Sequence, residues 1–555
     1  MWLVERYLPL DQLLAGLFVL LLLALAWCRP EFGGRALAPL EIFGSRLARF
    51  KRRAVLSIAA AAILLRLSLL WAIPVPTPAI HDEFSYLLAA DTFAHGRLTN
   101  PPHPMWLYFD TFHVNQHPAY MSKYPPAQGT VLALGQILGN PWIGVLLSTA
   151  AMCAAVVWML QGWLPPSWAL LGGVLVLLRF AIFGYWINSY WGGAIAAVGG
   201  ALVVGALPRI LRSRRPRDAI ILGFGVAILA NSRPFEGLVL CLPVAAVLLG
   251  WFFRSQTPSW RETLPRVVAP LCLVLLLCGI FMGYYNWRGT GNPFLFPYTV
   301  NDRTYAAPSA LLWDKTPTPI HYQNPQFEAF YNGWYRTCWW AEGRADSIGH
   351  AARILALDAG RFIRFFMWPE LCVPLLAFFW VLRDRRVRFL VVQAALCFVG
   401  FLLVAWFLPH YAAPVLATAF ALTTQGIRHL RKWQYRGRPV GIGFSRAIVL
   451  SAIVLAPWHA VNLPKPHVAA RAQVAAQLRE MPGQQLVIVR YSAQHDPSAE
   501  WVYNRANIDR AKIVWARDIP GVSLSPLLRY FHDRHVWLID ADSSFPKPIP
   551  YPGQP

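Results

Sequence analysis

Long apolar runs alternate with short polar segments along most of this chain. A helix needs about 20 apolar residues to cross a hydrocarbon layer of ~30 Å, and runs close to that length recur as far as residue 458. The pattern predicts about twelve membrane-spanning helices. The predicted spans are residues 8–27, 54–73, 141–161, 168–187, 190–207, 219–235, 237–253, 267–286, 366–382, 389–408, 410–427 and 441–458.

Basic residues fall in alternate loops between these runs. Because loops on the cytoplasmic side of a membrane carry an excess of Lys and Arg, the alternation places both termini outside the cytoplasm and predicts a multi-pass protein of the cytoplasmic (inner) membrane. The net charge of +23 then follows from topology and indicates no nucleic-acid partner. The basic clusters are at residues 49–53, 209–217, 254–266, 383–388 and 428–438.

Three regions follow from this layout. Residues 1–53 form an additional N-terminal span and a basic loop; we interpret the span as permanent, because residues 25–28 lack the small side chain expected at a cleavage site. Residues 54–458 form the membrane core, with outer loops at 74–140 and 287–365. The fold class is therefore an all-α polytopic membrane protein, followed by a small extracytoplasmic α/β domain at 459–555.

The α/β assignment comes from the pattern of the last hundred residues. A helix-like stretch at 468–479 precedes apolar, strand-like runs at 484–491, 511–516 and 535–540. Six cysteines fall inside predicted spans, and Cys338 is the one in a long outer loop, so we expect no disulfide framework outside the membrane.

Two adjacent acids, Asp82 and Glu83, stand directly after the second predicted span, at the expected outer face. A helix over 82–94 puts Asp82 on a stripe with Ser85 and Tyr86, which could hold a polar acceptor, and Glu83 on the next stripe. One interpretation makes Asp82 an N-cap and Glu83 a first-turn acid. The other makes one carboxylate a base in a pocket. Because neighbours on a helix point about 100° apart, we expect one base, with Asp82 preferred and Glu83 the alternative.

An acidic pair after an early span, a short helix, and then Lys123-Tyr124-Pro125-Pro126 resembles the GT-C membrane glycosyltransferases. The pattern is similar to protein O-mannosyltransferases, aminoarabinose transferases and Rgt-type galacturonosyltransferases, and covers residues 54–290. The resemblance implies transfer of a sugar from a polyprenyl-phosphate carrier to a lipid, glycan or protein acceptor at the outer face, with inversion at the sugar. It also implies that Asp82 or Glu83 is the base and that Lys123 and Tyr124 bind substrate.

Three features depart from that family pattern. They are the additional N-terminal span, the tyrosine that interrupts the Lys-Pro-Pro element, and His81 in front of the acids. They leave open which donor and which acceptor the chain uses.

The chemistry of such a donor fits the residues present. A glycosidase needs two separated carboxylates, whereas a polyprenyl phosphate leaves as a stabilised anion and needs one base and nearby cations. Arg66 and Arg179 lie in the outer halves of apolar spans, where we expect no carboxylate partner, so a backbone carbonyl, a lipid headgroup or a bound phosphate is each a candidate partner. Arg233 has Glu236 nearby, which favours an ordinary surface ion pair.

Five histidines share the first outer loop with the acids, so a divalent metal is conceivable there. The loop has no tight metal-ligand spacing, and Pro118 opposes a helix between His113 and His117. No cofactor is certain from the sequence and a divalent metal stays open, but we prefer to interpret these histidines as hydrogen-bonding groups. The five are His81, His95, His103, His113 and His117.

Two other functions stay open at this point. A transporter or flippase for lipid-linked glycans suits the many spans, but we find no internal repeat of the kind on which most transporters are built. A non-enzymatic membrane scaffold would use the C-terminal domain to bind a partner.

Overall fold

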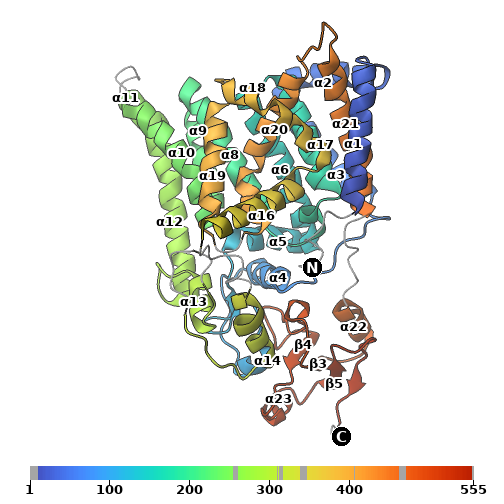
Figure 1. The fold of residues 1–555 in the computed structure, drawn as a ribbon. Helices are drawn as coiled ribbons and strands as arrows, with labels where there is room; N and C mark the ends of the chain where they lie inside the picture. Colours follow the sequence, from blue (N-terminus) through green and yellow to red (C-terminus); the bar gives the residue numbers. More distant parts are fainter. Residues whose placement is uncertain are drawn as a thin grey trace.

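A computed structural model of the chain describes residues 10–253, 260–308, 311, 317–337, 347–404, 407–461 and 470–552. Helices form a tall body, and a small sheet domain lies below it, on the side of α4 (His81–Ala94; Figure 1). Cys338 lies outside the described residues, and the seven described cysteines are unpaired.

The helices of the body are α1 (Leu10–Cys28), α2 (Gly34–Arg49), α3 (Lys51–Ser68), α6 (Pro141–Trp163), α7 (Pro166–Val176), η3 (Leu177–Ile182), η4 (Tyr185–Asn188), α8 (Gly193–Ser213), α9 (Pro216–Ala230), α10 (Pro234–Phe253), α11 (Trp260–Thr263), η5 (Leu264–Val268), α12 (Ala269–Thr290), α16 (Ile348–Phe366), α17 (Pro369–Cys372), η7 (Val373–Ala377), α18 (Phe378–Arg383), α19 (Arg388–Phe401), η8 (Pro409–Val415), α20 (Leu416–Leu430) and α21 (Val440–Val461).

Seven of the predicted spans coincide with helical segments that are long and apolar enough to cross a membrane. They are Leu10–Cys28, Pro141–Trp163, Pro166–Asn188, Gly193–Ser213, Pro234–Phe253, Trp260–Thr290 and Val440–Trp458. α16 and the Pro369–Arg383 segment would make an eighth, although they meet at an angle of 115°. The predicted span 366–382 is therefore only one arm of a bent pair.

The remaining predicted spans fall on helices that are shorter or more charged. α9 and α19 have 15 and 14 residues, and α3 begins with Lys51-Arg52-Arg53. Among the described residues, length and composition thus support seven or eight spans, and the predicted count of twelve is not confirmed.

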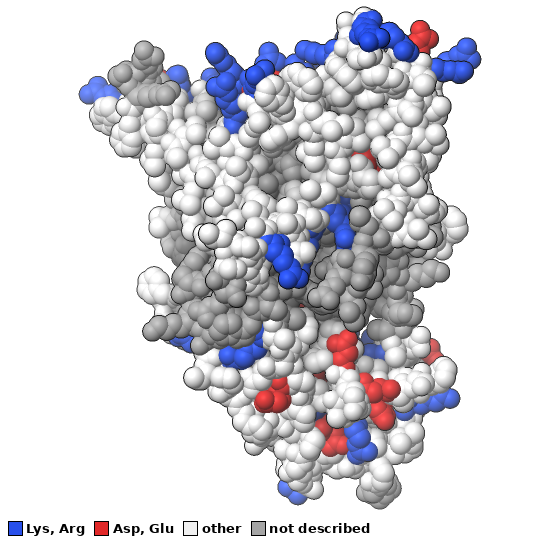
Figure 2. Space-filling model, viewed as in Figure 1, with Lys and Arg blue, Asp and Glu red and all other residues white. Residues whose placement is uncertain are grey.

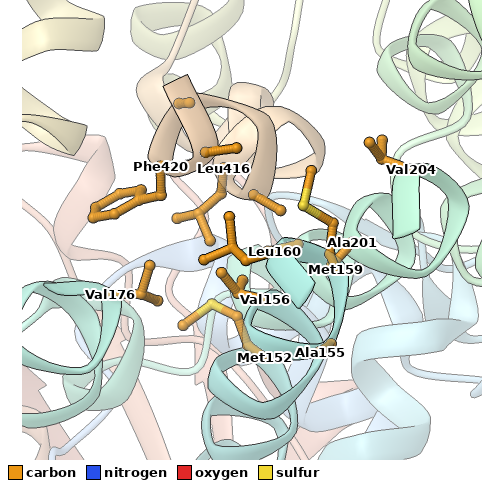
Figure 3. Packing of buried hydrophobic residues seen from close by; sticks show 14 of the residues in the cluster. Met152, Ala155, Val156, Met159, Leu160, Val176, Ala201, Val204, Leu416 and Phe420 are labelled. Carbon is orange, nitrogen blue, oxygen red and sulfur yellow. The ribbon is translucent and has the colours of Figure 1, made fainter. Parts of the chain in front are cut away.

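The core of the body forms around α6, which contacts α3, α5 (Pro126–Ile137), α7 and α8. Figure 3 shows how its Met152, Val156 and Leu160 point toward side chains of α7, α8 and α20. Small residues allow the backbones to approach: a Cβ at Gly200 would lie 1.9 Å from the carbonyl oxygen of Pro414. This close packing gives the outer loops a rigid support.

The outer elements lie between the body and the sheet domain (Figure 1). They are α4 (His81–Ala94), η2 (Trp106–Phe109), β1 (Val114–Asn115), β2 (Met121–Ser122), α5 (Pro126–Ile137), α13 (Pro297–Thr304), α14 (Pro325–Phe327) and η6 (Glu328–Tyr335). The helix predicted at 82–94 is thus confirmed as α4. β1 and β2 pair antiparallel, so the segment between His113 and His117 is not helical, as expected.

The predicted C-terminal α/β unit is also confirmed. It contains α22 (Ala470–Glu480), β3 (Gln485–Arg490), η9 (Pro497–Ala499), β4 (Ile513–Arg517), α23 (Ser525–Tyr530), β5 (His535–Asp540) and β6 (Ile549–Pro550). β3 pairs parallel with β4 and β5, and the unpredicted β6 pairs antiparallel with β5. One face of the sheet packs on the first outer loop, where Leu486 and Ile488 join a cluster with Phe84 and Phe109. The other face packs on α22.

Charge is distributed unevenly between the two ends of the molecule. Lys and Arg gather at the end of the body that carries α2 and α18, and the sheet domain at the other end carries both signs (Figure 2). α2 ends with Arg46 and Arg49, and α18 ends with Arg383. This asymmetry matches the alternating basic loops of the sequence.

Candidate active site

Asp82 and Glu83 lie in the first turn of α4, and backbone N–H groups donate hydrogen bonds to one of the two carboxylates. The helix starts at His81, with Ile80 as its N-cap, so Asp82 is not the N-cap. The Glu83 carboxylate instead accepts hydrogen bonds from the backbone N–H groups of Ala79 (2.9 Å), Ile80 (3.2 Å) and Tyr190 (2.9 Å). Burial raises the pKa of Glu83, and these three bonds oppose the shift. Glu83 therefore fixes the start of the helix.

Asp82 faces a different environment, made of aromatic and imidazole side chains. The hydroxyl of Tyr124 donates a hydrogen bond to Asp82 Oδ1. His81 Nε2 lies 3.3 Å from Asp82 Oδ2, and His113 Nε2 lies 3.9 Å from Asp82 Oδ1. The Asp82 side chain keeps 22% of its surface exposed, compared with 10% for His81 and 8% for His113. We call these four residues the Asp82 cluster; its carboxylate is more exposed than either imidazole.

The loop that carries His113 is fixed against α4. His113 adopts a left-handed backbone conformation (φ 62°), which is uncommon for a residue other than glycine and is often found at functional sites. Its carbonyl accepts hydrogen bonds from the Ser85 hydroxyl (2.6 Å) and the Lys123 N–H (3.1 Å). Ser85 also pairs with Ser122 and is fully buried, so the expectation that it holds an acceptor is wrong.

Burial determines the protonation of the groups around Asp82. It lowers the pKa of His81 and lowers the pKa of His113 well below its ordinary value, so both imidazoles are neutral near pH 7. Burial also raises the pKa of Tyr124, which keeps its hydroxyl proton and remains a donor to Asp82. The cluster thus surrounds one carboxylate with neutral polar groups.

Two cations lie beside this cluster. Lys123 Nζ is 3.8 Å from Asp302 of α13, a carboxylate that the sequence did not single out. The Arg233 guanidinium lies 4.3 Å from the centre of the Tyr411 ring and interacts electrostatically with Tyr86 and Tyr124.

Arg233 is connected to Asp82 through stacked aromatic rings. Tyr86 stacks on Tyr124, at 4.5 Å between ring centres, and Tyr124 contacts Asp82. The expected partner of Arg233 is Glu236, which is buried, so the interpretation of these two residues as a surface ion pair is wrong.

Arg66 and Arg179, the arginines of the apolar spans, donate their hydrogen bonds to groups outside the Asp82 cluster. Arg66 donates to the carbonyls of Ile73 (2.9 Å) and Pro74 (3.3 Å) and to Asn188 Oδ1 (3.0 Å), and so holds the connection that leads to α4. Arg179 donates to the carbonyl of Phe365, and its guanidinium lies 4.1 Å from the centre of the Trp368 ring.

A carboxylate does lie near Arg179, contrary to expectation. Glu370 is fully buried at the start of α17 and interacts electrostatically with the Arg179 guanidinium. The sequence reasoning overlooked it, because a single acid in the apolar run at 366–382 does not interrupt the hydropathy signal. α3 contacts α7 and η3, so the two arginine-bearing helices lie against each other.

A buried ion pair joins three outer regions next to the Asp82 cluster. Arg517, at the end of β4, donates to Glu500, to the Asp110 carbonyl (3.4 Å) and to Gln326 Oε1 (3.3 Å). Arg517 and Glu500 are both buried, and Phe112, two residues after Asp110, contacts His81. The C-terminal domain is therefore built into the wall that supports the cluster. Sequence spacing gives no sign of it, because the partners lie in three separate segments.

The five loop histidines separate into two groups. His95 contacts the Asp91 carbonyl, His103 pairs with Asp509 at 3.0 Å, and His117 packs on Trp106. His81 and His113 alone among the five join Asp82, and the potential ligand atoms of these three residues lie within 4.8 Å of one another. Imidazole nitrogen and carboxylate oxygen form a donor set compatible with a divalent metal.

Comparisons with known proteins bear on the fold. No protein-family model matches the chain, and no curated protein matches its sequence. Among solved structures, it is similar to the oligosaccharyltransferase of Archaeoglobus fulgidus in complex with zinc and sulfate, at a TM-score of 0.51 and 10% identity over 88% of this chain and 67% of the other. ArnT from Cupriavidus metallidurans bound to undecaprenyl phosphate gives a TM-score of 0.48 and 13% identity over 88% and 92%. The likeness shows that the chain shares the fold of that oligosaccharyltransferase.

Proposed function

We propose that this protein is a membrane glycosyltransferase that moves a sugar from a polyprenyl-phosphate carrier to an acceptor hydroxyl or amine, with Asp82 as the base. The observation that carries the proposal is the position of Asp82: it is the partly exposed carboxylate of a cluster of neutral polar groups, on a GT-C fold. Glu83 is the weaker candidate, because three backbone N–H groups already occupy its oxygens.

The reaction balances with the groups present. The acceptor oxygen or nitrogen forms a bond to the anomeric carbon, the bond from that carbon to the carrier phosphate oxygen breaks, and Asp82 takes the acceptor proton. The phosphate leaves as an anion, so no general acid is needed. A single displacement of this kind inverts the anomeric centre.

The cations near the cluster suit the leaving phosphate. Arg233 and Lys123 lie beside Tyr86 and Tyr124 at the side of Asp82, and a guanidinium matches the geometry of phosphate oxygens. Arg66 and Arg179 are weaker candidates, since backbone carbonyls already accept their hydrogen bonds. We assign to Arg66 the support of the 73–80 connection, which brings α4 into place.

A divalent metal is the alternative use of the same groups. His81, Asp82 and His113 would hold it, and when bound it would supply a positive charge that polarises the donor phosphate. Asp82 would then be a ligand with less basicity to offer an acceptor. Removing metal from the protein distinguishes the two uses.

We further propose that the reaction takes place on the outer face of the cytoplasmic membrane. The support is the gathering of Lys and Arg at the end of the body opposite the sheet domain, while α4 lies on the domain's side (Figures 1 and 2). A reporter fused after Pro555 should behave as extracytoplasmic and one fused after Arg217 as cytoplasmic. A cytoplasmic signal from the Pro555 fusion would contradict this placement.

The experiment for the reaction class uses purified protein in detergent, where transport across a bilayer has no meaning. Radiolabelled polyprenyl-phosphate sugars are added with an extract of envelope lipids and glycans as the source of acceptor. A transferase releases polyprenyl phosphate and moves the label to an acceptor. If carrier phosphate is not released, while vesicles containing the protein move the intact donor across the bilayer, the protein is a flippase. If it does neither, the scaffold interpretation is favoured.

A further inference from the structure

Five cations at the junction of α2 and α3 have no acidic partner among the described residues. The chain has no Asp or Glu between Glu41 and Asp82. Glu41 itself pairs with Arg431 (3.0 Å) and Arg446 (3.2 Å), so it is already neutralised by residues outside the junction. All five cations are exposed, and we call them the basic junction: Arg46, Arg49, Lys51, Arg52 and Arg53.

Large apolar side chains lie among these cations. Ile42 is 53% exposed, Phe43 is 66% exposed and Phe50 is 56% exposed. Ile42 and Phe43 precede Arg46 by four and three residues, so the three side chains are neighbours on the surface of α2. The Arg53 guanidinium lies 4.8 Å from the centre of the Phe50 ring. Exposed apolar side chains gathered in this way mark a surface that binds a membrane lipid or another partner.

The exposed side of α3 continues the apolar surface below the cations. Arg52, Leu56, Ala60 and Leu64 follow one another at intervals of four residues, so they form one stripe along the helix. Leu56 is 67% exposed and Leu64 is 66% exposed, whereas the opposite side of α3 is buried in the core. The stripe therefore starts with a cation and stays apolar for about three turns.

The position of the basic junction places it at the headgroup level of a membrane. α2 lies at the end of the body where Lys and Arg gather, opposite the sheet domain (Figures 1 and 2). α2 ends at Arg49 and α3 begins at Lys51, so the stripe of α3 starts at this end of the body and leads toward α4. Cations at the membrane surface and apolar side chains below them match the two parts of a phospholipid.

Another basic segment shows what distinguishes the junction. Residues 209–217 include the exposed Arg212, Arg215 and Arg217, but no exposed large apolar side chain, and Arg217 lies 3.5 Å from Asp218. A free phosphate or a nucleic acid would use the cations of the junction and leave its apolar side chains in water. A phospholipid contacts both kinds of side chain.

We propose that the basic junction binds the headgroup of an anionic phospholipid, with an acyl chain along the stripe from Arg52 to Leu64. Guanidinium groups match the geometry of phosphodiester oxygens, and clusters of Lys and Arg next to a membrane helix are typical of anionic-lipid recognition. Contact with the acyl chain adds apolar burial to this attraction. The site is separate from the Asp82 cluster, and the proposal goes beyond the proposed function without resting on it.

The test counts the lipids bound to the full-length protein in a neutral detergent by native mass spectrometry. The probes are dioleoylphosphatidylglycerol and dioleoylphosphatidylcholine, which share their acyl chains and differ in headgroup charge. We expect phosphatidylglycerol to bind wild type at least tenfold more tightly than phosphatidylcholine. The combined substitution Arg49→Gln, Arg52→Gln and Arg53→Gln should abolish this preference, because it removes the cations that meet the headgroup.

The matched control combines Arg212→Gln, Arg215→Gln and Arg217→Gln. It removes the same charge from the other basic segment and should keep the preference within about twofold of wild type. A junction variant with Lys at positions 49, 52 and 53 keeps the charge and should also prefer phosphatidylglycerol, which guards against a folding defect in the Gln variant. The thermal unfolding temperature is measured for every protein.

Three results would overturn the proposal: equal binding of the two lipids to wild type, an unchanged preference in the Gln variant of the junction, or an equal loss of preference in the matched control. Glycerol 3-phosphate, a headgroup without acyl chains, should not displace phosphatidylglycerol even in excess. Displacement would assign the junction to free phosphate esters and also overturn the proposal. The test needs no sugar donor, so its failure would leave the transferase standing.

Discussion

The first turn of α4 has two sides with opposite environments. On the side of Glu83, backbone N–H groups of residues 79, 80 and 190 surround the carboxylate, and the side chain secures the helix start. On the side of Asp82, imidazole and phenol groups face a carboxylate that remains partly exposed. Two acids one residue apart therefore have separate tasks, because a helix turns by about 100° per residue.

Replacing Asp82 with Asn should give the largest effect. The amide keeps the shape of the side chain but cannot accept the acceptor proton, so the transfer rate should fall on the order of 10²-fold or more. The thermal unfolding temperature and the affinity for polyprenyl-phosphate sugar should stay close to wild type. A variant that transfers sugar at a normal rate would remove Asp82 from the chemistry.

Replacing Glu83 with Ala should act on stability. It leaves three backbone N–H groups without their acceptor, and a buried unsatisfied donor costs about 1 kcal/mol or more, so the free energy of unfolding should fall by about 3 kcal/mol. Denaturant unfolding in detergent measures this. Glu83→Gln keeps one carbonyl oxygen and serves as the milder control. An Ala variant as stable as wild type would show that Glu83 does not hold the helix start.

Removing the hydroxyl of Tyr124 should give a smaller effect on the Asp82 side alone. Tyr124→Phe keeps the ring that stacks on Tyr86 and deletes the hydrogen bond to the carboxylate. Because hydrogen bonds to charged groups contribute about 1.5–3 kcal/mol, we expect roughly a tenfold slower transfer. A Tyr124→Phe variant that transfers sugar at the wild-type rate would show that the Tyr124 hydroxyl does not position Asp82.

The acid Asp110 sharpens the comparison through pH. Burial raises the pKa of Asp110 to about 7, against opposing effects of Tyr305 and Arg517. As the folded pKa lies above the unfolded value, this contribution to stability is complete below about pH 4 and is lost as the pH rises through 7. Unfolding between pH 4 and 8 should show this loss, and Asp110→Asn should flatten it. An unchanged profile in the variant would assign the dependence to another group.

Metal removal should have the smallest effect. If Asp82 is a base, dialysis against a chelator leaves the transfer rate within twofold of the untreated protein. Loss of activity that zinc or manganese restores would instead favour the metal held by His81, Asp82 and His113.

Much of the architecture could be predicted from the sequence because it follows hydropathy. The runs at 484–491, 511–516 and 535–540 became β3, β4 and β5, since short apolar segments between polar ones have few alternatives. The count of spans was harder. Spans are predicted from the length of an uncharged apolar run. The charges of α3, the short length of α9 and the bend between α16 and α17 all make that length a poor guide to the number of spans.

The site was predictable only in part. Asp82 and Glu83 stood out because they follow an apolar run, but hydropathy does not indicate which of the two carboxylates accepts hydrogen bonds from the backbone. His113 joins Asp82 through a left-handed turn and a bond from Ser85, and Arg517 reaches the outer loops from the C-terminal domain. These contacts depend on tertiary packing between distant segments, which no local pattern encodes.

The most direct measurement places the two neighbouring acids in one assay. The rate of polyprenyl-phosphate release from radiolabelled donor is compared for wild type, Asp82→Asn and Glu83→Gln, each normalised to the amount of folded protein. The account predicts a loss on the order of 10²-fold or more for Asp82→Asn and less than tenfold for Glu83→Gln. A normal rate in Asp82→Asn together with a 10²-fold loss in Glu83→Gln would contradict it and assign the base to the other side of the helix.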